Sequence, residues 1–341
     1  MRRFVGPLLA ALVAACATTP EVGWQAQHAA AEALREAVRF AEDPLPLAWT
    51  DVPVTATPVS INDADLEAGT GQLVYAGGVE ITSTFKRLHG LSDIKFEDAE
   101  SFWSISDEGL LVRGRVQLDA SGRLVGVEGV EVRPLVDPDN QPLIPKYLAD
   151  AEGLALMPNG ELLVSFERDH RVWRYDRDGR WLGERVIPDF PFTENEGMEA
   201  IAVGEPGEFW LAGEDGGHWR CAPAACRQWE PTPAIRPTDA DLRVVSMDAD
   251  PSDDVLFVLS RAYDSTRNAN TIRIERRRAP GMYPVYYPWS TLATFTAPAT
   301  VDNFEGIAAV RRPDGGVRLY ILSDDNFNPG QRTLLLAFDA R

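Results

Sequence analysis

Short apolar runs separated by turn residues recur along most of the chain, and this pattern constrains the fold more than any other feature. Examples are ELLVSFE at 161–167, EFWLAGE at 208–214 and RLYILSD at 318–324, with turn sequences such as PNG and RPDGG between the runs. Apolar runs bounded by Asn-Gly or Asp-Gly turns are typical of antiparallel hairpins. Because no helical periodicity interrupts the runs after residue 58, the sequence predicts an all-β architecture.

Five of these runs start at regular intervals and define a repeat. The starts lie 47 to 59 positions apart, at Asp93, Glu152, Glu199, Ser246 and Glu305. This interval matches one four-stranded blade, so we predict a β-propeller domain over 59–341. It should have five blades, or six if residues 51–90 form more than one strand. The run 71–81 can complete the blade that contains 333–340, which closes the ring and removes its exposed edges.

Each start has a partner near the end of the next strand. If the second hairpin turns at Asn159-Gly160, residues whose numbers sum to 319 face each other, and Glu152 then faces Glu167. The corresponding partners in the other repeats are Asp107, Glu214, Arg261 and Asp324. The first strands of a propeller line its central channel. We therefore expect these side chains to converge in one ring at a mouth of the channel, where opposed carboxylates repel each other.

Three interpretations of this acidic ring remain open. It could be a metal site, because carboxylate oxygens are the ligands that Ca²⁺ prefers. It could transfer protons, since close carboxylates raise one another's pKa. It could also be structural, with each acid capping its blade through backbone hydrogen bonds. On the first interpretation, the metal ligands are Asp93, Glu152, Glu199, Glu214 and Glu305.

The fourth repeat departs from the acidic pattern, because Ser246 and Arg261 replace its acid pair. Arg261 could bind a phosphate or a carboxylate with two parallel hydrogen bonds. It could equally pair with Glu199 or Glu305 of the ring. The side chains that we expect to carry chemistry are Glu167, Asp324 and Arg261.

Motifs of other hydrolases and of nucleotide-binding proteins are missing from the sequence. It contains neither a G-x-S-x-G elbow nor a phosphate-binding glycine loop. The four histidines have no metal-ligand spacing, and only His89, four residues before Asp93, is expected near the ring. A structural role for His89 is the alternative.

Three segments carry a family resemblance. DAEGLAL at 150–156, NEGMEAIAV at 195–203 and NFEGIAAV at 303–310, followed by Ser323-Asp324-Asp325-Asn326, resemble the family called "esterase-like activity of phytase". The resemblance covers about residues 70–341. It implies an exported bacterial propeller that hydrolyses phosphate esters, phytate-like or other, and it carries over no catalytic residue. In such an enzyme Ca²⁺ would offset the repulsion within the ring, bind substrate phosphate and activate water. The alternative is a non-catalytic envelope propeller that binds a ligand or a protein partner.

The first residues read as an export signal. Arg2 and Arg3 precede an apolar run that is too short to span a bilayer. The run ends in Val-Ala-Ala before Cys16, which resembles the lipobox of bacterial lipoproteins. We expect a signal peptide over 1–15, lipid modification at Cys16, and an outer-membrane location facing the periplasm or the cell surface. Residues 16–58 should be a tether, with a helix over 24–42 and a proline-rich linker over 44–58.

The net charge and the remaining cysteines limit the kinds of partner that the protein can have. The charge is −19, or −21 without the two arginines of the signal, so a nucleic-acid partner is disfavoured. Membrane contact is expected through the N-terminal lipid only, and the protein is expected to be a monomer. Cys221 and Cys226 should form a disulfide, because two thiols without nearby histidines make a poor zinc site.

Overall fold

The computed structural model describes residues 45–61, 72–144, 146–230, 232–235, 237–250, 255–267, 269–278, 289–296, 301–328 and 330–340. The predicted signal peptide 1–15, Cys16 and the predicted helix 24–42 lie outside the described residues. Residues 45–341 form a unit of their own. In the described part of the chain, no helix is long and apolar enough to cross a membrane.

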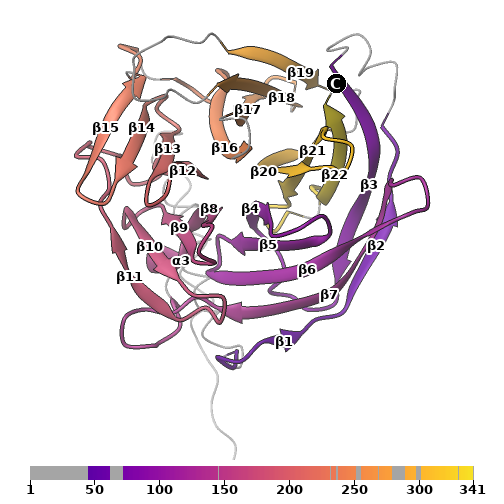
Figure 1. The fold of residues 1–341 in the computed structure, drawn as a ribbon, viewed down its shortest axis with the longest axis horizontal. Coiled ribbons are helices and arrows are strands. Elements are labelled where there is room, and N and C mark those ends of the chain that lie inside the picture. Colours follow the sequence, from indigo (N-terminus) through magenta and orange to yellow (C-terminus); the bar gives the residue numbers. More distant parts are fainter. Residues whose placement is uncertain are drawn as a thin grey trace, which may run out of the picture. The chain divides into compact units, whose positions relative to one another are not determined.

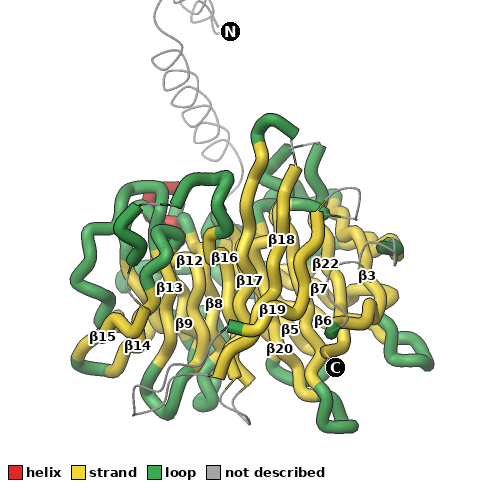
Figure 2. The backbone as a smooth tube through the Cα atoms, turned by 90° about the horizontal axis from the view of Figure 1, so that it is seen from above, coloured by secondary structure: helices red, strands yellow, loops and turns green. Residues whose placement is uncertain are grey.

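Antiparallel sheets surround a central axis, and the first strand of each sheet is the innermost one (Figure 1). Seen at right angles, the strands of successive blades run side by side along this axis (Figure 2). The five predicted blades are therefore confirmed. They are β4–β7 (Leu91–Phe96, Ser101–Ser106, Leu110–Leu118, Leu124–Pro134), β8–β11 (Ala151–Leu156, Leu162–Phe166, Arg171–Tyr175, Trp181–Arg185), β12–β15 (Met198–Val203, Phe209–Gly213, His218–Ala222, Ala225–Glu230), β16–β19 (Arg243–Asp250, Val255–Asp264, Ala269–Arg278, Ser290–Thr296) and β20–β22 (Asn303–Arg311, Val317–Asp324, Thr333–Ala340) completed by β3 (Leu73–Ser83).

The ends of the propeller close as the sequence predicts, because β3 pairs antiparallel with β22. Two details differ from expectation. Residues 45–58 contain β1 (Thr50–Asp51), which pairs with β7, and β2 (Val54–Pro58), which pairs with β3, so this stretch belongs to the sheet and is not a linker. Residues 51–90 thus hold more than one strand, yet the described strands form no sixth blade, because β2 only adds to the outer edge of the fifth.

The register of the second hairpin differs from the prediction, and each innermost strand carries a bulge near its start. Between the turn and the bulge the paired numbers sum to 318 rather than 319, as for Leu154 and Val164; beyond the bulge Ala151 and Phe166 sum to 317, and Glu152 is the unpaired residue. A bulge lets one residue project away from the regular ladder and re-aims its side chain. The five bulge residues are Ser92, Glu152, Glu199, Val245 and Glu305.

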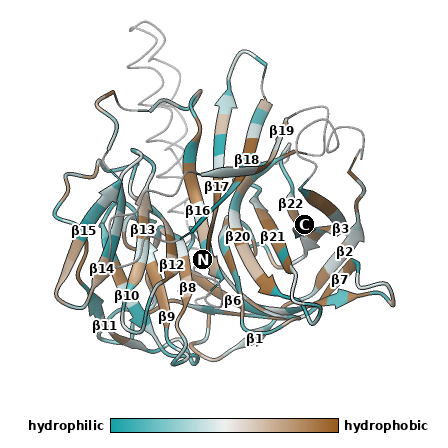
Figure 3. Ribbon diagram, turned by 45° about the horizontal axis from the view of Figure 1, so that its top comes forward, coloured by the Kyte–Doolittle hydropathy of each residue, from teal (hydrophilic) through white to brown (hydrophobic). Residues whose placement is uncertain are grey.

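The blades pack through apolar faces that leave little room between them. One buried cluster joins Leu163 of β9 to Met198 and Phe209 of the next blade. Inner strands such as β9, β20 and β21 carry strongly hydrophobic segments (Figure 3). The glycine of the repeated Glu-Gly pair permits this approach: a Cβ added at Gly153 would lie 2.5 Å from the carbonyl oxygen of Glu199. The glutamate of the motif thus projects at the bulge, while the glycine packs against the neighbouring blade.

Candidate functional site

The mouth of the channel is built from the bulge residues together with the residues that end each second strand. In the second blade, the backbone N–H of Glu167 donates to the carbonyl of Asp150 at 2.8 Å, so Asp150 is the residue opposite Glu167. The same relationship places Asp324 opposite Asn303 and Arg261 opposite Arg243. In the second blade three acids therefore meet at the mouth, and the sequence analysis had identified two of them, Glu152 and Glu167.

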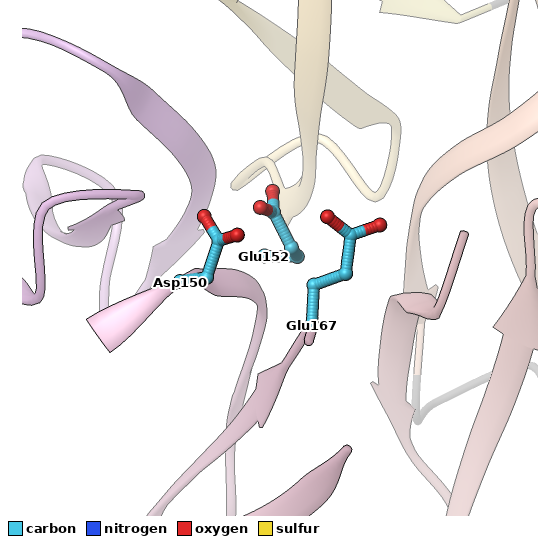
Figure 4. Close-up of side chains that lie close together, drawn as sticks. All are labelled: Asp150, Glu152 and Glu167. Atoms are coloured by element: carbon cyan, nitrogen blue, oxygen red, sulfur yellow. The ribbon is translucent and has the colours of Figure 1, made fainter. Parts of the chain in front are cut away.

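Asp150, Glu152 and Glu167 form the candidate metal centre. One carboxylate oxygen from each lies within 4.8 Å of the others. Figure 4 shows the three carboxylates side by side around the start of β8. Glu152 was a predicted ligand and Glu167 a predicted catalytic residue. Asp150 was missed, although the sequence Asp-Ala-Glu holds both acids two residues apart.

These three acids differ in how far the protein neutralises them. Asp150 is buried and accepts ion pairs from Lys146 Nζ at 2.7 Å and from Arg168 Nε at 2.5 Å. By contrast, no hydrogen bond or ion pair to another described residue holds the carboxylate of Glu152 or of Glu167. Two carboxylates therefore remain available to a cation.

The electrostatics of the centre favour either a bound cation or bound protons. Burial, followed by the charges of Glu199 and Asp150, raises the pKa of Glu152 well above its ordinary value. Burial and then Asp150 and Glu214 raise the pKa of Glu167 to about 8. Burial opposes the charge on Lys146, but Asp107 and Asp150 outweigh it and raise the pKa of that amine. Without a cation, a pKa of about 8 keeps Glu167 mostly protonated at neutral pH, and the pKa of Glu152 is shifted in the same direction.

The remaining acids of the ring have partners of their own. Glu214 lies 2.9 Å from an Arg243 nitrogen, and burial raises its pKa to about 7 against that cation. Glu305 pairs with Arg261 at 3.3 Å and accepts from Asn303 Nδ2 at 2.8 Å. Both were predicted metal ligands, but their charges are offset by arginines. The structure thus bears out the alternative reading in which Arg261 pairs with Glu305.

Glu199 and Asp324 complete the ring. Burial and then the charges of Glu214 and Glu167 raise the pKa of Glu199 well above its usual range. Burial and then the charges of Glu305 and Asp107 likewise raise the pKa of Asp324 well above its usual range. The N–H of Asn326, which donates to its carboxylate at 2.8 Å, opposes this increase. These couplings show that the acids from different blades form one electrostatic unit.

Asp93 lies outside this ring, which corrects the prediction that it is a metal ligand. Because Ser92 occupies the bulge of β4, Asp93 is one position further along the strand than Glu152 is in its blade. Its carboxylate is fully buried and accepts from Lys95 Nζ, Ser246 Oγ and the N–H of Leu154, each at 2.8 Å. Asp93 thus ties the innermost strands of three blades together inside the channel.

An open cavity of about 780 Å³ adjoins the ring at the fourth and fifth blades. Arg243 and Arg261 line it together with Glu214, and a third arginine, Arg332, contributes from the segment before β22. The sequence analysis found Arg261 only. The amide side chains that face this cavity are Asn270, Asn303, Asn326, Asn328 and Gln331.

The predicted disulfide is present. Cys221 and Cys226 are bonded at 2.02 Å and are cross-strand partners of β14 and β15. They flank the turn at Pro223-Ala224, and Cys221 is buried in the cluster between the second and third blades. The bond belongs to an outer hairpin rather than to the innermost strands that form the mouth.

Fold and site together define a five-bladed propeller with a carboxylate-rich channel mouth beside an arginine-lined cavity. The sequence matches the phytase-like family described as "esterase-like activity of phytase" over residues 86–327. Since this match spans most of the chain, the protein belongs to that family, and the resemblance in its motifs is confirmed. No curated protein sequence gives a match.

Solved structures show only distant likeness. A virginiamycin B lyase from Staphylococcus aureus aligns with a TM-score of 0.42 and 11% identity, over 83% of this chain and 99% of the lyase. A gluconolactonase from Xanthomonas campestris aligns with a TM-score of 0.41 and 13% identity, over 87% of this chain and 99% of the other. These scores are too low to support an argument, so the architecture rests on this chain's own sheets.

Proposed function

We propose that this protein hydrolyses phosphate esters at the channel mouth, with a divalent cation held by Glu152 and Glu167 beside Asp150. The observation that carries the proposal is the placement of three converging carboxylates in the same mouth as two arginines. Carboxylates suit a cation, and arginines suit the phosphoryl oxygens of a substrate. Membership of the phytase-like family supports the same class of reaction.

The donor set fits Ca²⁺, a hard cation that takes several oxygen ligands in flexible geometry. A bound cation would supply charge stabilisation for the phosphoryl group and an activated water. Glu152 and Glu167 would hold it, because no described residue occupies their carboxylates. Asp150 would orient the centre while it stays paired with Lys146 and Arg168.

The protein's cationic side chains would bind the substrate. Arg261 keeps N–H donors beyond the one that contacts Glu305, so it can bind phosphoryl oxygens from the cavity side. Arg243 contacts Glu196 and Asp239 as well as Glu214, so it keeps fewer donors for the substrate. The amide-lined wall offers donors and acceptors for a small hydroxyl-bearing leaving group. The substrate class is therefore a small organic phosphate, and phytate is one member to test.

The deciding experiment measures phosphate release from phosphomonoesters and phytate by the purified protein, with Ca²⁺ and with a chelator. We expect turnover that requires the cation and that is lost in the double variant Glu152→Gln/Glu167→Gln. Asp178→Asn, which changes an exposed acid of an outer turn, is the matched control and should retain activity. A folded wild type that releases no phosphate from any ester with any divalent cation would refute the proposal.

A second candidate function is ligand binding without catalysis, by an envelope propeller. The ion pairs of Asp150 favour it, because Lys146 and Arg168 already neutralise this acid and leave fewer charges at the mouth for catalysis. In that case Ca²⁺ or an anionic ligand would bind without turnover. Calorimetric titration alongside the activity screen separates the two functions.

We also propose export and lipid anchoring through Cys16, with the body in the periplasm or at the cell surface. The support is the sequence Val-Ala-Ala-Cys at the end of the apolar run. Replacement of Cys16 by Ser should move the protein from the membrane fraction to the soluble fraction. Retention of that variant in the membrane fraction would contradict the proposal.

A further inference from the structure

His89 and Asp325 form a hydrogen-bonded pair beside the ring, although 236 positions separate them in the chain. His89 Nδ1 lies 2.6 Å from Asp325 Oδ2. The aspartate is itself held firmly: Thr333 Oγ1 donates to the same oxygen at 3.1 Å, and the N–H of Phe327 donates to Oδ1 at 3.1 Å. The carboxylate is therefore a fixed acceptor that orients the imidazole.

The second ring nitrogen of His89, Nε2, has no hydrogen-bond partner among the described residues, and the side chain is 35% exposed. A carboxylate on one imidazole nitrogen fixes which tautomer is present and leaves the other nitrogen available for proton transfer. The ring of Phe327 packs 5.3 Å away and restricts the orientation further.

Three successive residues at the end of β21 and after it have different surroundings. Asp324 interacts electrostatically with Glu305 of the acidic ring, Asp325 binds His89, and Asn326 lines the arginine cavity. Asn326 and Phe327 both adopt positive φ, at 49° and 52°. Left-handed backbone is unfavourable for a bulky aromatic residue, and such strain is retained mainly where the surrounding structure demands it, which is often a functional site.

We propose that His89, oriented by Asp325, donates a proton from Nε2 to the leaving-group oxygen of the substrate; this inference rests on the proposed phosphate-ester hydrolysis. As water bonds to phosphorus, the bond between phosphorus and the leaving oxygen breaks, and that oxygen takes the proton. The attacking water releases its own proton to solvent, and His89 takes one back from solvent. Asp325 is a positioning residue, since it acts only through His89.

The charges around His89 suit this role. The hydrogen bond that Nδ1 donates to Asp325 raises the pKa of the imidazole against the opposing effect of burial, and the charges of Asp325 and Asp107 add to the increase. Asp107 in turn is paired with Lys146 Nζ at 2.7 Å. The imidazole thus remains protonated at pH values where a free histidine has begun to lose its proton.

The test compares two substrates that differ in their need for a proton. An alkyl ester such as glycerol 2-phosphate leaves as a strongly basic alkoxide, whereas 4-nitrophenyl phosphate leaves as a stable anion. We expect His89→Gln to lower kcat about 100-fold or more with the alkyl ester, as for loss of a general acid. With the nitrophenyl ester kcat should change less than about threefold. Asp325→Asn should move the alkaline limb of the alkyl-ester pH profile to lower pH.

The outcomes separate this inference from the function on which it rests. A folded His89→Gln variant that loses both activities equally, or neither, refutes the proton donor while leaving phosphate-ester hydrolysis intact. A wild type that hydrolyses neither ester refutes both. If His89→Gln does not fold, the pH profile of Asp325→Asn tests the proposal instead. An alkaline limb at the same pH as in the wild type would refute the role of His89 and Asp325 in proton donation.

Discussion

Lys95 donates from Nζ to both carboxylate oxygens of Asp93 at 2.8 Å, inside the propeller channel. The two side chains are 2% and 0% exposed. Lys95 also donates to the carbonyl of Ile307 at 3.0 Å, so the pair joins the first blade to the fifth as well as to the second and fourth. The channel therefore contains a buried ion pair, in which Lys95 and Asp93 offset each other's charge.

Removal of one member of this pair should destabilise the protein strongly. Lys95→Met leaves Asp93 buried without its cation, and we expect a loss of about 3–5 kcal/mol in the free energy of unfolding. Arg115→Met breaks the exposed pair with Glu100 and should cost less than about 1 kcal/mol. Urea unfolding of both variants checks this. Equal losses would show that the channel pair is no more important than a surface pair.

The glycine of the Glu-Gly motif should be required for contact between blades. Gly153→Ala places a methyl group 2.5 Å from the Glu199 carbonyl and also 2.5 Å from Ser165 Oγ, so we expect a cost of about 1–3 kcal/mol. At Gly330 the nearest atom to an added Cβ is 3.4 Å away, and Gly330→Ala should change stability by less than about 0.5 kcal/mol. Thermal unfolding distinguishes the two, and a neutral Gly153→Ala would contradict the close packing.

Calcium should stabilise the folded protein through the three-carboxylate centre. A ligand at a hundredfold excess over its Kd raises the free energy of unfolding by about 2.7 kcal/mol. We therefore expect the Tm to rise with millimolar Ca²⁺ and to fall with chelator. Glu152→Gln/Glu167→Gln should abolish this response, whereas Asp178→Asn should keep it. A wild-type melting curve that neither addition moves would exclude the cation.

In chelator, stability should fall as the pH rises from about 4.5 to about 8. Below 4.5 Glu167 carries a proton in both the folded and the unfolded states. As the pH rises, the unfolded state loses this proton first, because burial and nearby acids raise the folded pKa to about 8. Proton binding that favours the folded state is thereby lost. Glu167→Gln should flatten the dependence of Tm on pH, and a slope identical to the wild type would show that Glu167 does not titrate in this range.

The propeller could be predicted from the sequence because its hairpins repeat locally. Regular starts such as Glu152 and Glu199 reveal blade length, and Asn159-Gly160 reveals a turn. The bulges could not be predicted, since a bulge is decided by how a strand meets its neighbours. In the first blade the bulge falls at Ser92, one residue before Asp93, so Asp93 lies inside the channel and not in the predicted ring.

The candidate site could be predicted from the sequence only in part, for a related reason. Residues of one hairpin, such as Glu152 and Glu167, can be associated by counting from the turn. Lys146 approaches the ring from a segment whose placement depends on the whole fold, and no local pattern identifies it. Arg243 lies opposite Arg261 in one hairpin, but the bulge between them and the turn makes simple counting miss that pairing. Pairing between distant side chains, such as His89 with Asp325, was likewise beyond a local reading.

The pairing of β3 with β22 also determines when the molecule can finish folding. Val79 and Leu335 are partners although 256 positions separate them. Closure of so long a loop costs entropy, and topologies with distant pairings fold slowly. On the ribosome, the middle blades can form from local hairpins while β3 waits for the last strand to emerge. Until those eight residues arrive, a nascent chain exposes unpaired strand edges, and a premature stop codon before Thr333 would leave them exposed permanently.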